Sequence, residues 1–293
     1  MLRLTTFVAP VVLVCACGPG TPSFDGGQVD AGTDAGIDAG FDAGVDAGGD
    51  AGTDAGLPSE HQVQRRLGTT DADNGFYEYL PPRYEDLVPR PLLVFWHGVG
   101  ENGNGTTQLS LVLVAGPPML INNDTWPLTR PFIVLSPQHT GVGDCPTAVE
   151  VRAFIDWAVS AYRVDPKRVF LTGLSCGAIG SWDYLGSFTD EKVAAAVLIA
   201  GDPGDPTQAF SAWGRANCNL GKVAIWAFHG DADQTVDIAF EQQTMNNLFA
   251  CPAPPRRETF WTPIVGGSHF IWDSVYDTSC GDVYAWLLAH PKP

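Results

Sequence analysis

The chain of 293 residues carries 33 acidic against 16 basic side chains, a formal net charge of −17 at pH 7, and 45% of its residues are hydrophobic. This acidic balance argues against nucleic acid or an anionic lipid surface as its partner. Residues 1–58 hold one Arg and eight Asp, which leaves −10 for residues 59–293, a length sufficient for one domain with a sizeable buried core.

The first residues have the pattern of an export signal. Arg3 precedes an apolar run over residues 7–14, which is too short to span a bilayer, and small residues follow it. The tetrapeptide Val-Cys-Ala-Cys at residues 14–17 resembles a bacterial lipobox, in which cleavage occurs just before a cysteine that is then acylated. We therefore expect a lipoprotein signal peptide over residues 1–16 and lipidation of Cys17, with an unlipidated cleaved signal or a short buried strand as the alternatives. Lipidation would anchor the chain to a membrane of the cell envelope, facing the periplasm or the cell exterior.

Residues 17–58 form a low-complexity segment in which the unit Asp-Ala-Gly occurs seven times at a spacing of four, from Asp30 to Asp54. Gly and Asp disfavour both helix and strand, apolar residues are sparse, and the like charges repel one another. The composition therefore predicts a solvated, disordered tether, with an r.m.s. reach of roughly 35 Å for about forty residues. A calcium-binding repeat is the alternative, but Ca²⁺ needs about six to eight ordered oxygens, and this repeat lacks the longer period of known calcium coils.

In residues 59–293, short apolar runs rich in β-branched and aromatic residues alternate with helical patterns. This alternation predicts an α/β fold with a mostly parallel central sheet and helices on both faces. Two earlier runs, at residues 62–67 and 76–80, alternate more openly and predict an antiparallel hairpin. The parallel strands are expected at residues 92–96, 132–135, 169–172, 193–200, 223–228 and 258–262, and the helices at residues 148–161, 176–185, 236–249 and 282–289.

The pentapeptide Gly-Leu-Ser-Cys-Gly at residues 173–177 lies between a predicted strand and a predicted helix. The active sites of parallel sheets lie on loops beyond the carboxyl ends of the strands, and the pentapeptide has this position. Gly-x-Ser-x-Gly in such a context indicates a nucleophile elbow, in which a sharp turn lifts the serine hydroxyl above the sheet. Backbone N–H groups at the helix start can then meet an oxyanion. Ser175 is therefore the candidate nucleophile.

A serine needs a general base, and the chain offers six histidines. His269 lies in a glycine-rich loop at residues 266–272, after the last predicted strand and before a helix, which is the position that this fold demands. The remaining five lie beside the tether, near the chain end or directly after inner strands, where an imidazole commonly supports a loop from within: His61, His97, His139, His229 and His290.

The carboxylate that orients the imidazole is expected on the loop between the nucleophile and the base. Ser, then acid, then His is the chain order of α/β hydrolases. Asp233 is preferred because its spacing from the His-Gly pair at residues 229–230 places it at the loop apex. Asp231 is the alternative, and Asp202 and Asp205, which follow the preceding strand, are less favoured.

Two backbone N–H groups are expected to form the oxyanion hole. One belongs to Cys176, directly after the nucleophile, and the other to Val99, in the glycine-rich loop at residues 97–103. Glycine-rich turns after strands are common, so this loop gains weight only from its agreement with the other motifs.

Five cysteines lie in residues 59–293, and an oxidising compartment permits two disulfides with one thiol left over. Cys176 is expected to be that thiol, because a disulfide beside the nucleophile would crowd the turn. Cys218 and Cys251 flank one predicted strand and helix, and we expect them to pair. The sequence leaves the pairing of Cys145 and Cys280 open.

Four motifs in order resemble those of the phospholipase/carboxylesterase group of α/β hydrolases and its polyhydroxybutyrate depolymerase-like relatives. They are His-Gly-Val-Gly-Glu at residues 97–101, Gly-Leu-Ser-Cys-Gly at 173–177, His-Gly-Asp-Ala-Asp at 229–233 and Ser-His-Phe-Ile-Trp at 268–272. The stretch at residues 162–169 also looks like theirs, and the resemblance covers roughly residues 75–290. It implies an α/β-hydrolase fold and a catalytic triad of Ser175, Asp233 and His269. Two departures, Ala178 where Gly is frequent and Gln234 where Pro is frequent, weaken inference about the substrate.

We therefore expect a secreted serine hydrolase that cleaves carboxylic esters through an acyl-enzyme. Its substrate would be a small or polymeric ester, such as a short acyl ester, a polyester or an acylated polysaccharide. The alternatives are a prolyl-oligopeptidase-like peptidase, which usually carries an additional specificity domain, and a surface binding protein that keeps the fold without turnover.

No cofactor and no metal is expected, because the cysteines lack zinc spacing and the glycine clusters lack a phosphate-binding lysine. The only membrane contact expected is the lipid anchor, and the chain is expected to be a monomer. Three tryptophans could line a substrate pocket or simply pack in the core: Trp126, Trp213 and Trp272.

Overall fold

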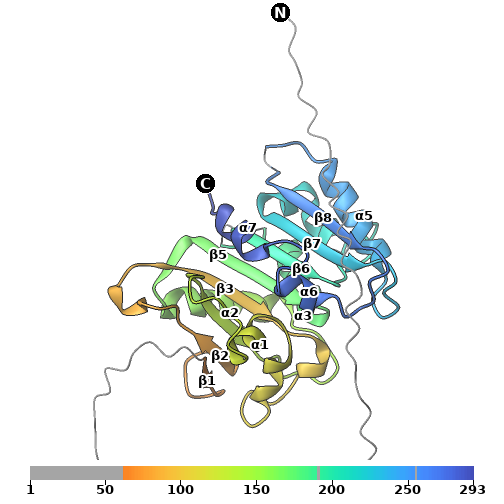
Figure 1. Cartoon of the computed structure of the whole chain (residues 1–293). Helices are drawn as coiled ribbons and strands as arrows, with labels where there is room; N and C mark the ends of the chain where they lie inside the picture. Colours follow the sequence, from red (N-terminus) through yellow and green to blue (C-terminus); the bar gives the residue numbers. More distant parts are fainter. Residues whose placement is uncertain (1–61, 190–191, 255) are drawn as a thin grey trace, which may run out of the picture. The chain divides into compact units, whose positions relative to one another are not determined.

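The computed structural model describes residues 62–189, 192–254 and 256–293. The predicted signal peptide, the lipidation of Cys17 and the Asp-Ala-Gly tether lie outside these residues. The described chain forms one eight-stranded sheet with the strand order β1-β2-β4-β3-β5-β6-β7-β8, and helices cover it (Figure 1).

The sheet is parallel from β4 to β8 and antiparallel at the β1–β2 edge. Strand β2 pairs antiparallel with both β1 and β4, so the predicted entry hairpin and the predicted parallel sheet are confirmed. The strands are β1 (Val63–Arg65), β2 (Phe76–Tyr79), β3 (Arg90–Trp96), β4 (Ile133–Pro137), β5 (Val164–Leu174), β6 (Ala195–Ile199), β7 (Ala224–Gly230) and β8 (Thr259–Ile264).

The inner strands β3, β6 and β7 consist largely of buried apolar residues because both faces of the sheet are covered. In β3, Leu92, Val94 and Trp96 point into one core layer, while Leu93 and Phe95 point into the other. This alternation follows from the two-residue period of a strand. The strands are therefore held from both sides, and only the loops at their ends are free to carry chemistry.

Each face of the sheet has its own helices. One layer is formed by α2 (Ala148–Ala161), α3 (Cys176–Ser187), α4 (Ala212–Ala216) and α5 (Ile238–Phe249), and the other by α1 (Gly116–Asn122), α6 (Trp272–Tyr276) and α7 (Val283–Ala289). The four predicted helices are confirmed as α2, α3, α5 and α7. Sequence reasoning missed α1, α4 and α6; α4 and α6 have five residues each, too few for the apolar periodicity of a helix to emerge.

Two disulfides join described residues, and one of them corrects a prediction. Cys218 and Cys251 pair, as expected. Cys176 is not the leftover thiol, because it pairs with Cys145 on the loop between β4 and α2. That loop runs along α3: a side chain at Gly180 would meet the Pro146 carbonyl oxygen at 2.4 Å, so the missing side chain allows the close approach. The disulfide therefore reaches sideways to a neighbouring loop and does not crowd the turn.

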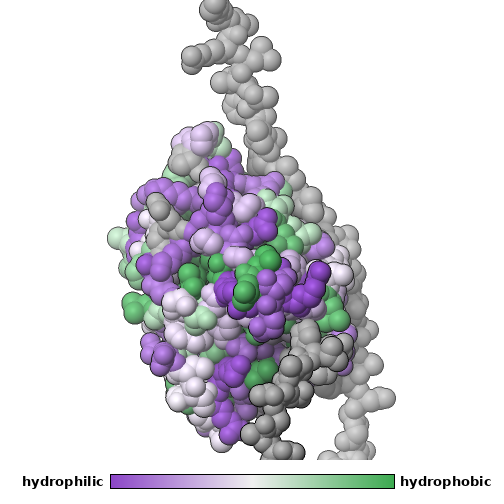
Figure 2. Space-filling view, turned by 90° about the vertical axis from the view of Figure 1, so that its left-hand side faces the viewer, coloured by the Kyte–Doolittle hydropathy of each residue, from purple (hydrophilic) through white to green (hydrophobic). Residues whose placement is uncertain are grey.

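The molecular surface is mixed in character. The face turned to the viewer in Figure 2 is largely hydrophilic, with apolar side chains gathered in small patches. Within the part of the chain that the structure describes, no helix has both the length and the apolar character required to cross a bilayer.

Candidate active site

Ser175 lies on a sharp turn between β5 and α3. Its backbone angles are φ 49° and ψ −119°, which non-glycine residues rarely adopt, and its N–H donates to the Ile199 carbonyl at 2.8 Å. The turn is possible because its neighbours lack side chains. A Cβ at Gly177 would lie 2.1 Å from the Trp96 carbonyl oxygen, and one at Gly173 would lie 2.6 Å from the Gly177 carbonyl oxygen. The predicted elbow thus has the strand-turn-helix geometry that the motif requires.

The three residues of the predicted triad form a hydrogen-bonded chain. His269 Nε2 lies 2.8 Å from Ser175 Oγ, and His269 Nδ1 lies 2.7 Å from Asp233 Oδ2. The carboxylate accepts on Oδ2 only if Nδ1 carries the proton, which leaves Nε2 free to accept from the serine hydroxyl. The three side chains therefore have the polarity that a general base needs in order to activate a serine.

The sheet register brings His269 and Asp233 together. Gly230 at the end of β7 pairs with Ile264 at the end of β8, so the loops that follow these strands start side by side. Ala232 N–H donates to the Gly267 carbonyl at 2.9 Å and joins the two loops directly. Asp233 and His269 lie on these loops.

Several donors hold the Asp233 carboxylate in its ionised form. Burial opposes ionisation, but the N–H of Val236, the imidazole of His269 and the N–H of Thr235 outweigh it and lower the pKa of Asp233. The two backbone N–H groups donate to Oδ1 at 3.0 and 2.8 Å. Asp233 is thus a fixed negative charge behind the imidazole.

The other carboxylates that the sequence offered have different partners. Asp231 accepts from the Gly266 N–H at 2.6 Å and so ties the β7 and β8 loops together. Asp202 accepts from the Gly204 N–H, and Asp205 accepts from Thr207. In the described structure the His269 ring is bonded instead to Asp233 Oδ2, so the geometry favours Asp233.

The two loops proposed to form the oxyanion hole flank Ser175. Val99 begins the 3₁₀ turn Val99–Glu101 after β3, and Cys176 begins α3. A methyl group at Gly98 would lie 3.7 Å from the Ser175 Cβ, so the turn passes directly beside the nucleophile. Strands β3 and β5 are neighbours at the point where the strand order reverses, which is where ligands bind in open parallel sheets.

Comparison with solved structures decides the fold. The structure is similar to a thermostable esterase (21% identity, TM-score 0.54, covering 78% of this chain and 62% of that one). It is also similar to esterase 2 of Thermogutta terrifontis phosphorylated by paraoxon, with 15% identity, a TM-score of 0.50 and coverage of 72% of this chain and 84% of that one. A third similar structure is an acylaminoacyl peptidase of Pyrococcus horikoshii, with 13% identity, a TM-score of 0.53 and coverage of 79% of this chain and 42% of that one. The chain has the α/β-hydrolase fold. No protein-family model and no curated protein sequence matches it.

Within this α/β-hydrolase fold, a second histidine contacts the acid. His229 Nε2 lies 3.2 Å from Asp233 Oδ2, and its Nδ1 lies 2.6 Å from Glu241 Oε2. Burial opposes protonation of His229, but Glu241, the Val236 carbonyl and Asp233 outweigh it and raise the pKa of the imidazole. Burial raises the pKa of Glu241, although His229 and Trp182 donate to it.

Sequence reasoning did not single out Glu241, although its pattern carried a signal. It shares the buried face of α5 with Thr244, Met245 and Leu248 at helical spacing. A carboxylate on such an apolar face needs a partner, and the His-Gly pair at residues 229–230 ends the strand that precedes this helix.

A further histidine pair lies beside the proposed oxyanion loop. His139 N–H donates to His97 Nε2 at 3.0 Å, so the proton of neutral His97 is on Nδ1, which donates to the Gly98 carbonyl at 2.6 Å. Burial lowers the pKa of His97 to about 4. The His139 ring lies between two carboxylates, with Nδ1 2.8 Å from Glu150 and Nε2 3.2 Å from Asp144.

The three tryptophans have different surroundings. Trp126 is buried and packs against Tyr284, with ring centroids 4.9 Å apart, so it belongs to the core. Trp213 is half-buried against the core layer of α3. Trp272 lies beside the active site, because its ring is 5.4 Å from the His269 ring.

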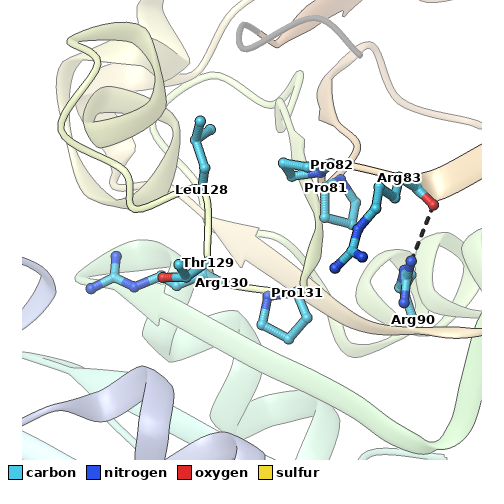
Figure 3. Close-up of a pocket in the computed structure, with 8 residues that line it drawn as sticks. All are labelled: Pro81, Pro82, Arg83, Arg90, Leu128, Thr129, Arg130 and Pro131. Carbon is cyan, nitrogen blue, oxygen red and sulfur yellow. Dashed lines mark hydrogen bonds between the residues drawn. The ribbon is translucent and has the colours of Figure 1, made fainter. Parts of the chain in front are cut away.

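One pocket of about 310 Å³ lies at the opposite end of the strands (Figure 3). Arg90, the first residue of β3, lines it together with residues 81–83 and with residues 128–131, which precede β4. The Arg90 guanidinium is bound to the Arg83 carbonyl at 3.1 Å and to Asp86 at 2.5 Å. Arg130 stacks on Tyr284 at 3.8 Å. The pocket contains none of the proposed catalytic residues.

Across residues 62–189, 192–254 and 256–293, no group of three or more His, Cys, Asp or Glu side chains is arranged to hold a metal ion.

Proposed function

We propose that the protein is a serine hydrolase that cleaves carboxylic esters through an acyl-enzyme. The observation that carries this proposal is the chain of hydrogen bonds from Ser175 through His269 to Asp233, at 2.8 and 2.7 Å, on a strained strand-to-helix turn. The similarity to two esterases supports it.

In the first half of the reaction, Ser175 Oγ attacks the ester carbonyl carbon while its proton passes to His269 Nε2. Asp233 holds the resulting imidazolium through Nδ1–H and stabilises its charge. The N–H groups of Val99 and Cys176 stabilise the negative charge on the tetrahedral oxygen. The imidazolium then gives its proton to the leaving alkoxide, the ester C–O bond breaks, and an alcohol departs.

In the second half, water attacks the acyl group on Ser175 and gives a proton to His269 Nε2. Collapse of the second tetrahedral intermediate returns this proton to Ser175 Oγ and releases a carboxylic acid. The same residues act in both halves, so the chain needs no other acid or base.

Two exposed apolar side chains border the proposed site and favour an apolar ester group. Val99 is 46% exposed and lies on the oxyanion loop, while Phe270 is 73% exposed and directly follows His269. We therefore propose that the substrate is an ester with an apolar acyl or alcohol group, such as a short acyl ester, a polyester unit or an acylated polysaccharide.

The test is hydrolysis of p-nitrophenyl acetate, butyrate and octanoate by the wild type, Ser175→Ala and the control Ser160→Ala. Ser160 is exposed on α2, so its loss should leave kcat unchanged. Ser175→Ala should lower kcat by about 10⁴-fold or more while the fold persists. Paraoxon should add one phosphoryl group to the wild type and none to Ser175→Ala.

Comparing ester substrates with amide substrates separates an esterase from a peptidase and from a binding protein. Turnover of N-acylated aminoacyl anilides in preference to esters would favour a peptidase, which the similarity to acylaminoacyl peptidase keeps as the second candidate. A wild-type protein that shows no turnover and no phosphorylation would contradict the proposal and favour a binding protein.

We further propose that Cys17 carries a lipid anchor and that the following segment tethers the catalytic domain to a membrane of the cell envelope. The lipobox-like sequence at residues 14–17 and the Asp-Ala-Gly composition support this proposal.

A further inference from the structure

The carboxylate of Asp233 lies between two imidazoles. Oδ2 is 2.7 Å from His269 Nδ1 and 3.2 Å from His229 Nε2. The side chains of His229, Asp233 and Glu241 have no exposed surface. The reaction described above uses only the first imidazole, so the second requires its own explanation.

The surroundings of His229 determine where its proton lies. Nε2 faces the Val236 carbonyl at 3.0 Å and the Asp233 carboxylate, and both groups are acceptors only. Nε2 must therefore carry a hydrogen. On the other side, a single proton is shared between Nδ1 and Glu241 Oε2 at 2.6 Å. Wherever that proton sits, the pair has no net charge and Nε2 keeps its hydrogen.

Glu241 is itself anchored to the helix of the nucleophile. Its Oε1 accepts from Trp182 Nε1 at 2.7 Å, and Trp182 lies on α3, which begins directly after Ser175. A continuous chain of contacts therefore runs from α3 through Glu241 and His229 to the acid, and from the acid through His269 to the nucleophile.

We propose that His229 and Glu241 are positioning residues that hold Asp233 in the orientation needed by His269. This inference rests on the proposed function. Oδ1 of the carboxylate is fixed by two backbone N–H groups, whereas Oδ2 would otherwise be held only by the base. His269 gains and loses a proton twice in each catalytic cycle, but the Nε2–H of His229 does not change. It therefore supplies Oδ2 with a constant donor and also fixes the Val236 carbonyl of the acid-bearing loop.

A purely structural role is the competing explanation. A buried ionisable pair is an expensive way to fill a core, because apolar side chains of similar volume are often equally stabilising. The pair is placed where it contacts the acid, which a structural role does not require. The experiment must therefore separate the loss of positioning from the loss of stability.

The variants keep or remove the two hydrogen bonds. In His229→Gln, an amide N–H replaces the Nε2 donor, and in Glu241→Gln, the amide can donate to Nδ1 while its oxygen accepts from Trp182. Leucine at either position removes the contact. Since a single leucine leaves its partner buried and unpaired, the double variant His229→Leu/Glu241→Leu is measured as well.

We expect the leucine variants, including the double variant, to lower kcat on p-nitrophenyl butyrate by about 10- to 100-fold, with KM changed by less than about threefold. The glutamine variants should recover at least about a third of the wild-type kcat. His290→Leu, which breaks the remote ion pair with Glu258 at the other end of the sheet, should leave kcat unchanged. Melting temperatures report stability separately.

A double-mutant cycle with Asp233→Asn decides between the two explanations. If His229 acts through the acid, His229→Leu should lower kcat by less than about threefold once Asp233 is Asn. The inference would be overturned if His229→Leu lowered kcat by the same factor in the wild-type and Asp233→Asn backgrounds. It would also be overturned if His229→Leu kept the wild-type kcat, or if the glutamine variants recovered no activity. A wild type that is inactive on esters, or as inactive as Ser175→Ala, would instead overturn the proposed function.

Discussion

Ser175 combines a strained backbone with the hydroxyl of the proposed nucleophile. Its positive φ of 49° with ψ −119° costs about 1–3 kcal/mol for a residue with a side chain. Glycine would remove this cost but also the hydroxyl that contacts His269. The strain persists because β5 and α3 hold both ends of the turn, and it aims Oγ at the base.

At the same scale, His97 should make stability depend on pH. Its pKa is about 4 in the folded protein against 6.5 unfolded, because burial disfavours the charged ring. Between these values the unfolded chain binds more protons, so the free energy of unfolding should fall by about 3 kcal/mol as the pH drops from 6.5 to 4. Urea unfolding at pH 4, 5, 6 and 7 measures this slope.

His97→Gln isolates the contribution of that one ring. The amide oxygen of Gln can accept from the His139 N–H as Nε2 does, but it does not titrate. The difference between the two proteins in the pH dependence of the free energy of unfolding should therefore equal the His97 contribution. The carboxylates contribute equally to both proteins and cancel in this difference. The same slope in both proteins would contradict the assignment.

Single residues also show what a sequence can reveal about a site. The elbow and the base were accessible because their motifs follow predicted strands. The choice between Asp231 and Asp233 rested on loop spacing and on the family resemblance, whereas the structure shows Asp231 bound to the Gly266 N–H. Cys176 was wrongly predicted to be the leftover thiol, because its pairing with Cys145 depends on the path of a loop along α3, which sequence patterns do not record.

At the scale of elements, the length of the pattern decided what could be predicted. The long helix α2 was recognised because its period repeats, and the buried strands were recognised as apolar runs rich in β-branched and aromatic residues. The short helices α1, α4 and α6 were not, and β5 begins at Val164, earlier than the apolar run. Its first five residues are not buried and include Asp165, Lys167 and Arg168, and pairing of Arg90 with Val164 extends the strand.

The two disulfides close loops of similar length but tie different elements together. Cys145–Cys176 and Cys218–Cys251 span 31 and 33 residues, so loss of either should lower the free energy of unfolding by about 3 to 4 kcal/mol. Only the first is attached to the residue whose N–H is proposed for the oxyanion hole. The Cys145→Ala/Cys176→Ala protein should therefore also lose kcat, by about tenfold or more.

Cys218→Ala/Cys251→Ala is the matched control for this prediction. It should show the same loss in chemical unfolding but keep the wild-type kcat at a temperature where both variants are folded. Equal losses of kcat in the two variants would show that the Cys145–Cys176 bond contributes stability alone.

At the scale of the whole molecule, the charge is divided between two kinds of sequence. Residues 1–58 carry −7 and contain none of the proposed catalytic residues, while residues 59–293 carry −10 and contain all of them. The acidic balance disfavours adsorption to an anionic membrane surface. A lasting membrane association would therefore depend on the proposed lipid at Cys17.

Substitution at Cys17 tests this division of roles. Cys17→Ser should move the protein from the membrane fraction to the aqueous fraction and abolish incorporation of labelled palmitate. Cys15→Ser, two residues earlier in the same segment, should keep both properties. Hydrolysis of a soluble p-nitrophenyl ester should have the same kcat/KM in all three proteins, because the proposed mechanism uses residues 97–269 only. Membrane association of Cys17→Ser equal to that of the wild type would show that another part of the chain holds it there.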